Sequence, residues 1–378
     1  MRTSCVAVSV LGVVALSFIG SHGQGAEPLG TGAAAAAPAQ TFVRPATVPR
    51  LAPRFVVEET SERATTFTPV PKRVSAAQSP VANQLPASVV STCAVDGLKF
   101  RWPLDDAAGT AWVINNFTDV DPTGGKKDFL NASGDAALTY DGHQGYDIDV
   151  GSFREMDQNK DIVRAAAEGD VVAIDQSHED RHTSCVNGDW NYVAIKHANG
   201  FVSYYGHLKK SSVKVRLGAH VPEGQELGIV GSSGCSTTPH LHFEVQDCEN
   251  RWLEPASRGM WKSPPQGGEV SGVLDVMIRS GDAINWELKD PAPNLTTTYK
   301  GRELGIGLSA ATRAGDEITI GVYSPGTPPN VWSWAPPGRY GHRFAAWPVF
   351  VGNQPGLVSI VVWVNLKQVD TRTVTILP

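Results

Sequence analysis

The stretch Pro239-His240-Leu241-His242-Phe243-Glu244-Val245 alternates apolar and polar side chains along its whole length. This period of two predicts a β-strand with the apolar side chains on one face and both histidines on the other. Because a strand rises about 3.3 Å per residue, His240 and His242 would lie about 6–7 Å apart on the same side. That spacing suits one metal ligand and one proton carrier, although a half-buried strand with two incidental histidines would give the same pattern.

The composition of the whole chain limits the classes of protein to consider. Its 378 residues leave room for two or three domains, and 41% hydrophobic with 19% charged residues is typical of a globular protein. A net charge of −6 argues against a nucleic-acid binder, because such proteins are usually basic. We therefore expect a folded protein with no nucleic-acid partner.

The first 26 residues are typical of a secretory signal peptide. Met1-Arg2 supplies a positive end, residues 6–19 form an apolar run without charge, and small residues follow at 21–26. The run is too short for a membrane span, and no later segment approaches about 18 uninterrupted apolar residues. We expect an extracytoplasmic protein, secreted or periplasmic, with no transmembrane segment.

Four cysteines follow the signal peptide, namely Cys93, Cys185, Cys235 and Cys248. An even number in an exported chain favours disulfides over free thiols. The sequence permits three pairings. A bridge between Cys235 and Cys248 would clamp the strand that they flank and would leave Cys93 to pair with Cys185.

Composition and strand patterns divide the rest of the chain. Residues 27–92 are rich in Ala, Pro, Thr and Ser, which predicts a flexible linker or a pro-segment. Residues 93–264 show short strands separated by turns, with a hairpin at Asn199-Gly200, and predict a compact antiparallel β-sheet domain. After a Pro/Gly-rich joint, residues 268–378 predict a β-sandwich-like accessory domain. The predicted fold class is mostly β.

Five aromatic residues lie close together in the accessory domain: Trp332, Trp334, Tyr340, Phe344 and Trp347. If they are exposed, they could stack on the sugar rings of a cell-wall polysaccharide. A sandwich core would explain them equally well.

Two groups of residues compete as a metal site, and the first is His178-Glu179-Asp180-Arg181-His182, which matches HExxH. That motif requires a helix, because only helical spacing places both histidines on one face. The surrounding residues have no apolar helical face, and the Asn187-Gly188 turn leaves little room for one. We interpret the match as a chance one in a polar loop.

The second group consists of His143, Asp147, His207 and the pair His240/His242. In a straight strand His143 and Asp147 would lie about 13 Å apart, too far to share a metal. Gly142 and Gly145 permit a bend that would bring them together. Two histidines and one aspartate with a water would form the open four-coordinate arrangement of catalytic zinc.

Three motifs in this group resemble the signatures of the M23 (lysostaphin/LytM-type) zinc metallopeptidases in order and spacing. They are His143-x-Gly145-x-Asp147, Tyr205-Gly206-His207-Leu208, and the stretch from Gly231 to Glu244 that contains His240-Leu241-His242. The resemblance covers about residues 100–254. It implies a compact antiparallel β domain that cuts the peptides of bacterial peptidoglycan.

The resemblance also implies a role for each residue. His143, Asp147 and His242 match the ligands of Zn²⁺, in preference to Asp149, which lies two residues beyond Asp147. His207 and His240 match the two catalytic histidines that are not ligands. Zinc in such a site polarises the scissile carbonyl and lowers the pKa of water, and we expect His240 to carry the proton.

Three functions follow as hypotheses. The first is a secreted zinc endopeptidase acting on peptidoglycan cross-links, because all five polar residues are present. The second is a non-catalytic module on the same fold that binds the cell wall or activates another hydrolase. The third is a zincin that uses His178 and His182.

Overall fold

The computed structural model describes residues 42–53, 55–58, 97–105, 112–134, 137–186, 189–263, 272–281, 293–313, 315–336 and 341–378. The expected signal peptide lies outside these ranges, and the expected linker or pro-segment is described only at 42–53 and 55–58. In this part of the chain no helix is both long and apolar enough to span a membrane. The described residues are almost entirely β-strand and loop, so the predicted mostly β, antiparallel fold class is confirmed.

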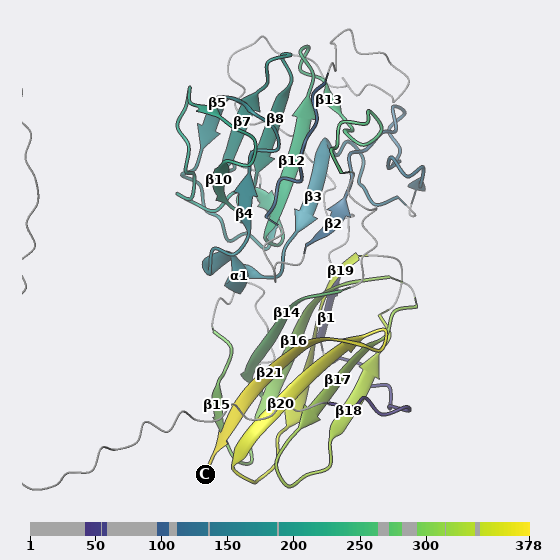
Figure 1. The fold of residues 1–378 in the computed structure, drawn as a ribbon. Helices are drawn as coiled ribbons and strands as arrows, with labels where there is room; N and C mark the ends of the chain where they lie inside the picture. Colours follow the sequence, from purple (N-terminus) through teal and green to yellow (C-terminus); the bar gives the residue numbers. More distant parts are fainter. Residues whose placement is uncertain are drawn as a thin grey trace, which may run out of the picture. The chain divides into compact units, whose positions relative to one another are not determined.

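The opening stretch is a central strand of the first large sheet, whose order is β2-β3-β12-β8-β7-β5-β9, with β13 added to β12 (Figure 1). These strands are β2 (Val113–Asn116), β3 (Gly145–Asp149), β5 (Gly169–Asp175), β7 (Tyr192–Lys196), β8 (Val202–Gly206), β9 (His220–Val221), β12 (His240–Gln246) and β13 (Trp252–Leu253). All of their pairings are antiparallel. Every residue of β12 is buried, because β3 and β8 flank it and its polar face lies inside the site described below.

Smaller elements complete this domain. Strand β4 (Ile162–Arg164) pairs with β10 (Glu226–Ile229), and β6 (Ser184–Cys185) pairs with β11 (Cys235–Ser236). Helix α1 (Phe153–Asp157) follows β3, and the Ser152 hydroxyl caps it by accepting from the Glu155 N–H. The core beneath the sheet is apolar and aromatic, with Phe100, Phe243 and Trp261 in mutual edge or tilted contact.

Of the three pairings that the sequence permits, the bridge between Cys235 and Cys248 is not the one that forms. Cys185 is bonded to Cys235, because the pairing of β6 with β11 sets these two residues directly opposite each other. Cys248 is also disulfide-bonded. Cysteines that flank a strand are near in sequence, but the register between β6 and β11 is a tertiary property that the sequence does not show.

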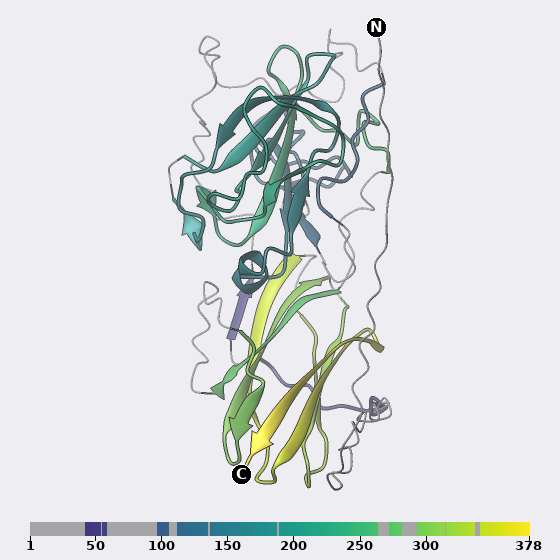
Figure 2. The ribbon, with the colours of Figure 1, turned by 60° about the vertical axis from the view of Figure 1, so that its left-hand side comes forward.

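The second half of the chain, together with residues 55–58, forms two sheets packed face to face (Figure 2). One has the order β1-β19-β16-β14 and the other β15-β21-β20-β17-β18, and only the β15–β21 pairing is parallel. The strands are β1 (Phe55–Glu58), β14 (Gly272–Ser280), β15 (Thr297–Tyr299), β16 (Glu303–Thr312), β17 (Ile318–Tyr323), β18 (Asn330–Trp334), β19 (Gly341–Phe350), β20 (Gly356–Val364) and β21 (Lys367–Leu377). We call this unit the sandwich.

The aromatic residues that suggested sugar binding lie inside the sandwich. Trp332, Trp334, Phe344 and Trp347 are between 1% and 5% exposed, and Tyr340 lies outside the described residues. Trp347 contacts both of the other tryptophans in the space between the sheets. The three tryptophans therefore belong to the core of the sandwich, and Phe344 is buried as well, so none of the four side chains offers a surface for sugar rings.

Strand β1 comes from the segment expected to be a linker or pro-segment. Residues 55–58 pair antiparallel with β19, and the Leu51 N–H donates to the Ser333 carbonyl of β18 at 2.9 Å. Both partners are edge strands, whose unpaired backbone groups can accept an added segment. Composition does not report this backbone pairing. The chain thus contributes to the sandwich before residues 97–263 and returns to it at β14.

The sandwich also packs against the sheet domain through buried side chains. Leu274 and Ala311 belong to the same apolar core as Phe243. Asp275 at the start of β14 accepts from the Ser152 hydroxyl at 2.7 Å and forms an ion pair with Arg154, and all three side chains are buried. Burial of this kind favours a defined contact over a loose tether.

Asp161, a buried carboxyl group close to Glu155 and Asp275, should make the stability of the fold depend on pH. Asp161 is 4% exposed, and burial, followed by the nearby Glu155 carboxylate, raises the pKa of Asp161 to about 7. Its unfolded pKa is near 3.8. The folded state therefore binds an extra proton between these values, and stability is lost as the pH rises from about 4 to 7.

We expect Asp161→Asn, which cannot ionise, to raise the free energy of unfolding at pH 8 by about 2–4 kcal/mol. The same variant should flatten the pH dependence between about pH 4 and 7. Urea unfolding at pH 5 and pH 8 measures both effects. Asp170→Asn, at a side chain that is 67% exposed, is the matched control and should change little. An Asp161→Asn variant no more stable than wild type at pH 8 would contradict the expectation.

Candidate metal centre

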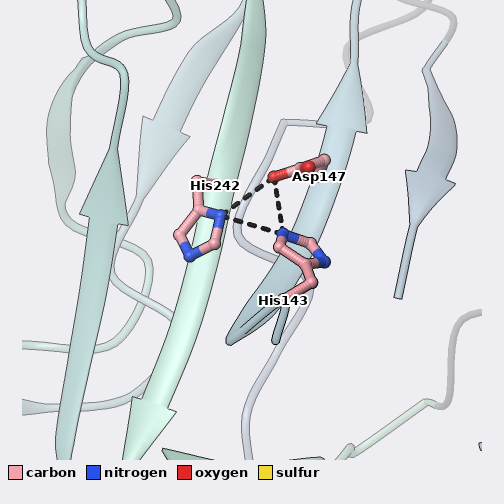
Figure 3. A group of neighbouring side chains, drawn as sticks. All are labelled: His143, Asp147 and His242. Carbon is pink, nitrogen blue, oxygen red and sulfur yellow. Dashed lines mark hydrogen bonds and ion pairs between the residues drawn. The ribbon is translucent and has the colours of Figure 1, made fainter. Parts of the chain in front are cut away.

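Three side chains predicted as ligands converge on one point (Figure 3). One ligand atom from each of His143, Asp147 and His242 lies within 4.8 Å of the others. Asp147 Oδ1 is 3.1 Å from His143 Nε2 and 2.9 Å from His242 Nδ1, and the two ring nitrogens are 3.3 Å apart. All three residues are buried. Two imidazoles and one carboxylate in this arrangement leave room for a further ligand.

Backbone pairing accounts for the position of each side chain. Asp147 in β3 stands directly opposite His242 in β12. His143 precedes β3, and the backbone turns there at Gly142, which has φ +76° and donates its N–H to Asp119. The sequence predicted a bend at Gly142 and Gly145, but in the structure only Gly142 has a positive φ and lies at the turn. A Cβ on Gly145 would lie 2.5 Å from the Phe243 carbonyl oxygen, so this glycine permits close strand pairing.

Each of the three side chains also has a second partner that fixes its orientation. His143 Nδ1 donates to the Phe117 carbonyl at 2.8 Å, and Asn116 Nδ2 donates to Asp147 Oδ2 at 3.1 Å. His242 Nε2 lies 3.6 Å from Glu244 Oε2. Such outer contacts orient metal-ligating imidazoles and carboxylates. The residues present therefore fit a divalent ion such as zinc.

Burial and neighbouring charges act against each other on these groups. Burial would raise the pKa of Asp147, but the charge of His143 and the hydrogen bonds around it hold that pKa well below its usual range. Burial would lower the pKa of His242, but its contacts with Asp147 and Glu244 raise it to about 9. The carboxylate is thus ionised at neutral pH, which is the state needed for a metal ligand.

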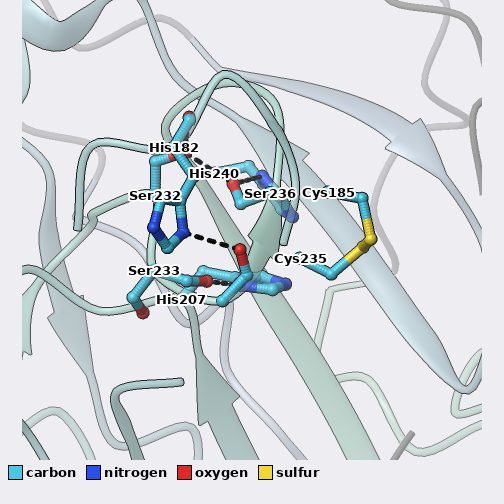
Figure 4. Close-up of a disulfide and its surroundings, with 9 residues drawn as sticks. His182, Cys185, His207, Ser232, Ser233, Cys235, Ser236 and His240 are labelled. Atoms are coloured by element: carbon cyan, nitrogen blue, oxygen red, sulfur yellow. Dashed lines mark hydrogen bonds between the residues drawn. A yellow bond between two sulfur atoms is a disulfide. The ribbon is translucent and has the colours of Figure 1, made fainter. Parts of the chain in front are cut away.

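The two histidines predicted to be catalytic stand beside this group. The rings of His207 and His240 are 4.4 Å apart, and His240 Nε2 lies 3.6 Å from Asp147 Oδ1. His207 Nδ1 donates to the Ser233 carbonyl at 2.6 Å (Figure 4). His240 Nδ1 donates to the Thr238 carbonyl at 2.8 Å. In a neutral ring, a protonated Nδ1 leaves Nε2 as the acceptor.

Burial and the neighbouring His240 and His242 lower the pKa of His207 well below its ordinary value. This imidazole is therefore neutral at pH 7. The loop that accepts its Nδ1–H is held by the disulfide between Cys185 and Cys235 (Figure 4). The disulfide thus supports the wall of the site.

Trp190 is a part of the site that sequence reasoning missed. Its ring centroid lies 4.7 Å from that of His207 and 5.5 Å from that of His242. A Cβ on Gly206 would lie 1.9 Å from the Trp190 ring, so only glycine fits there. The only hint of Trp190 in the sequence was Gly206 in Tyr205-Gly206-His207, because a glycine can mark a place where another side chain packs against the backbone. The sequence does not say which side chain that is. Nothing in the sequence pointed to Asn116. Glu244 could have been found, because strand alternation places it on the same face as His240 and His242.

The histidines of the HExxH match do not join the group of three ligand atoms. His178 and His182 are not on a helix: His178 Nε2 pairs with Asp175 at 2.9 Å, and His182 Nδ1 donates to the Gly234 carbonyl at 2.7 Å. Within the described ranges, only His143, Asp147 and His242 form a set of three ligand atoms close enough to hold one metal ion. Fold and site together thus define an antiparallel β domain with a buried group of two histidines and one aspartate that could hold a metal ion.

Residues 141–255 match the model of peptidase family M23. Cell division protein DipM of Caulobacter vibrioides is 45% identical over 56 residues, which cover 15% of this chain and 9% of DipM. Peptidoglycan DD-endopeptidase ShyA of Vibrio cholerae is 44% identical over 55 residues, which cover 15% of this chain and 12% of ShyA. The catalytic domain of the M23 protein EnpA of Enterococcus faecalis has a TM-score of 0.26 and 26% identity, over 38% of this chain and 89% of that chain.

The chain therefore contains a peptidase family M23 domain, and the resemblance drawn from its motifs is confirmed. All five predicted site residues fall within residues 141–255. The matched segments span only about a tenth of the length of DipM and ShyA.

Proposed function

We propose that this protein is a zinc metalloendopeptidase that hydrolyses peptide bonds in bacterial peptidoglycan cross-links. The observation that carries the proposal is the convergence of His143, Asp147 and His242 beside two further imidazoles. A binding module would need the fold but not this complete set. The M23 domain and a relative named as a peptidoglycan DD-endopeptidase support the substrate class.

In this proposal His143 Nε2, Asp147 Oδ1 and His242 Nδ1 hold the ion, because these are the atoms that face one another. A bound zinc supplies Lewis-acid polarisation of the scissile carbonyl and lowers the pKa of the attacking water. Asn116 and Glu244 keep the carboxylate and the imidazole in place. The buried surroundings strengthen these electrostatic interactions.

His240 takes the proton of the attacking water on Nε2 and returns a proton to the leaving amine. It suits this role because its Nδ1–H is committed to the Thr238 carbonyl and its Nε2 points toward the ligand group. His207 presents a second neutral Nε2 and orients the water or the substrate. Trp190 packs against His207 and His242 and restricts their motion.

The proposed location is extracytoplasmic, since peptidoglycan lies outside the cytoplasmic membrane and the Cys185–Cys235 disulfide suits an oxidising compartment. The proposal does not extend to polysaccharide binding by the sandwich, because the aromatic residues that suggested it are in the core.

Digestion of purified peptidoglycan tests the proposal. The zinc-loaded protein should release soluble muropeptides from at least one wall type, a chelator should stop the release, and added zinc should restore it. Mass spectrometry of the products identifies the bond that is cut. If zinc-loaded protein cleaves no wall type or defined cross-linked muropeptide, the proposal fails and the non-catalytic module is favoured.

A further inference from the structure

His207 follows the last residue of β8 and has a backbone conformation that few residues other than glycine adopt. Its φ is +58°, in the left-handed region. Such a conformation costs free energy and persists only where the surrounding structure holds it, often at functional sites. The contacts that hold this turn therefore also decide where the His207 imidazole lies.

Asn191, directly before β7, holds the residue after the turn from both sides. Its backbone carbonyl accepts from the Leu208 N–H at 3.0 Å, and its side-chain Nδ2 donates to the Leu208 carbonyl at 3.0 Å. The first of these peptide groups is the one that joins His207 to Leu208. Asn191 and Leu208 are both 0% exposed, so breaking either bond would leave a buried polar group without a partner.

The other polar groups of Asn191 are bonded as well. Its Oδ1 accepts from the His178 N–H at 2.8 Å, and its Nδ2 also donates to the His178 carbonyl at 3.0 Å. Its backbone N–H donates to the Ser233 hydroxyl at 2.9 Å. The carbonyl of the same Ser233 accepts from His207 Nδ1 (Figure 4). Asn191 therefore contacts both the turn that carries His207 and the loop residue that fixes its ring.

We infer that Asn191 is a positioning residue for His207, which holds the left-handed turn and the Ser233 loop together and so places the His207 ring beside His240 and His242. This inference rests on the proposed function, in which His207 orients the water or the substrate. Asn191 has no exposed surface to offer a substrate and is not in the metal-binding group. Its effect on catalysis must therefore pass through His207.

The residue before Asn191 contacts the same imidazole. The ring of Trp190 packs against that of His207, with centroids 4.7 Å apart. Two consecutive residues thus hold His207, one through its ring and the other through its backbone. This double restraint is what a strained turn at a catalytic residue requires.

A purely stabilising role is the competing explanation, because any buried amide with several hydrogen bonds contributes to stability. Asn294 in the sandwich offers the comparison. Its Nδ2 donates to the Val276 carbonyl at 2.8 Å, and its Oδ1 accepts from the Ile278 N–H at 2.9 Å. Asn294→Ala therefore removes the same kind of bridge between backbone groups, but outside the sheet domain, and is the matched control.

Kinetics of the full-length Asn191→Ala variant are the first test. On a defined cross-linked peptide, kcat should fall by about 10–100-fold, the effect expected when a catalytic group is misplaced. KM and the zinc content should change little. Asn294→Ala should lower the melting temperature and leave kcat unchanged. If Asn191→Ala does not fold, Asn191→Ser, which keeps a hydroxyl that can bond one backbone group, gives the same comparison with smaller effects.

NMR of protein with isotope-labelled histidines is the second test, and it needs no turnover. The Nδ1–H of His207 should give a resonance that is protected from solvent exchange, and His207→Ala identifies it by its absence. Asn191→Ala should remove this protection. The Nδ1–H of His143, bonded to the Phe117 carbonyl at 2.8 Å, should stay protected as an internal reference.

The inference requires both changes. If either kcat or the His207 resonance stays as in wild type in a folded Asn191 variant, the inference is overturned. An equal loss of kcat in Asn294→Ala would also overturn it, because stability alone would then explain the loss. A wild-type protein that cleaves no peptidoglycan would overturn the proposed function, and the His207 resonance would then decide alone whether Asn191 positions this ring.

Discussion

Replacing His242 with alanine should remove bound zinc and lower peptidase activity by about 10³-fold or more. Among the described residues, His242 supplies one of the three converging ligand atoms, and it stands opposite Asp147 in the paired strands. A catalytic zinc site usually has three protein ligands, so the two that remain are too few to hold the ion. The loss should therefore appear in metal content as well as in rate.

Elemental analysis of the purified protein measures the metal content, and release of muropeptides measures the rate. His220→Ala is the matched control, because this imidazole on β9 is 66% exposed and pairs with Asp170 of β5. Wild type and the control should each carry one zinc per chain. Stoichiometric zinc in His242→Ala would show that the ligand assignment is wrong.

His240→Ala should separate metal binding from catalysis. The variant should keep its zinc and its fold, yet lose about 10²–10⁴-fold in kcat, the usual contribution of a general acid–base group. The reason is that His240 Nε2 adjoins the ligand group at 3.6 Å from Asp147 but is not one of its three members. KM should change much less than kcat.

Steady-state kinetics on a defined cross-linked peptide, with zinc content determined on the same samples, measures this separation. His178→Ala serves as the control, since His178 pairs with Asp175 away from the site. It should match wild type in both zinc content and kcat. Zinc loss in His240→Ala would reassign that residue as a ligand, and zinc loss in His178→Ala would revive the zincin hypothesis.

The sequence predicted the parts of the site that local patterns encode. Strand alternation placed both histidines of β12 on one face, and the motif order added His143, Asp147 and His207. The residues that it missed are determined by tertiary packing. Asn116 comes from a neighbouring strand without a motif, and Trp190 is visible only through the glycine beside it.

The same limit explains the errors and omissions in the fold. Which cysteine faces Cys185 depends on the register of two short strands far apart in sequence. The pairing of residues 55–58 with β19 depends on a free sheet edge that forms much later in the chain. Low-complexity composition describes the average character of a segment, whereas a four-residue strand needs only a few suitable backbone groups.

Strand β1 has a consequence for the order of folding. Phe55 pairs with Ala346, so the first strand of the sandwich must wait while the whole sheet domain and most of the remaining strands emerge. Contacts this distant in sequence form slowly and leave sheet edges exposed to wrong partners in the meantime. The sandwich would therefore be completed only after nearly all of the chain has been synthesised.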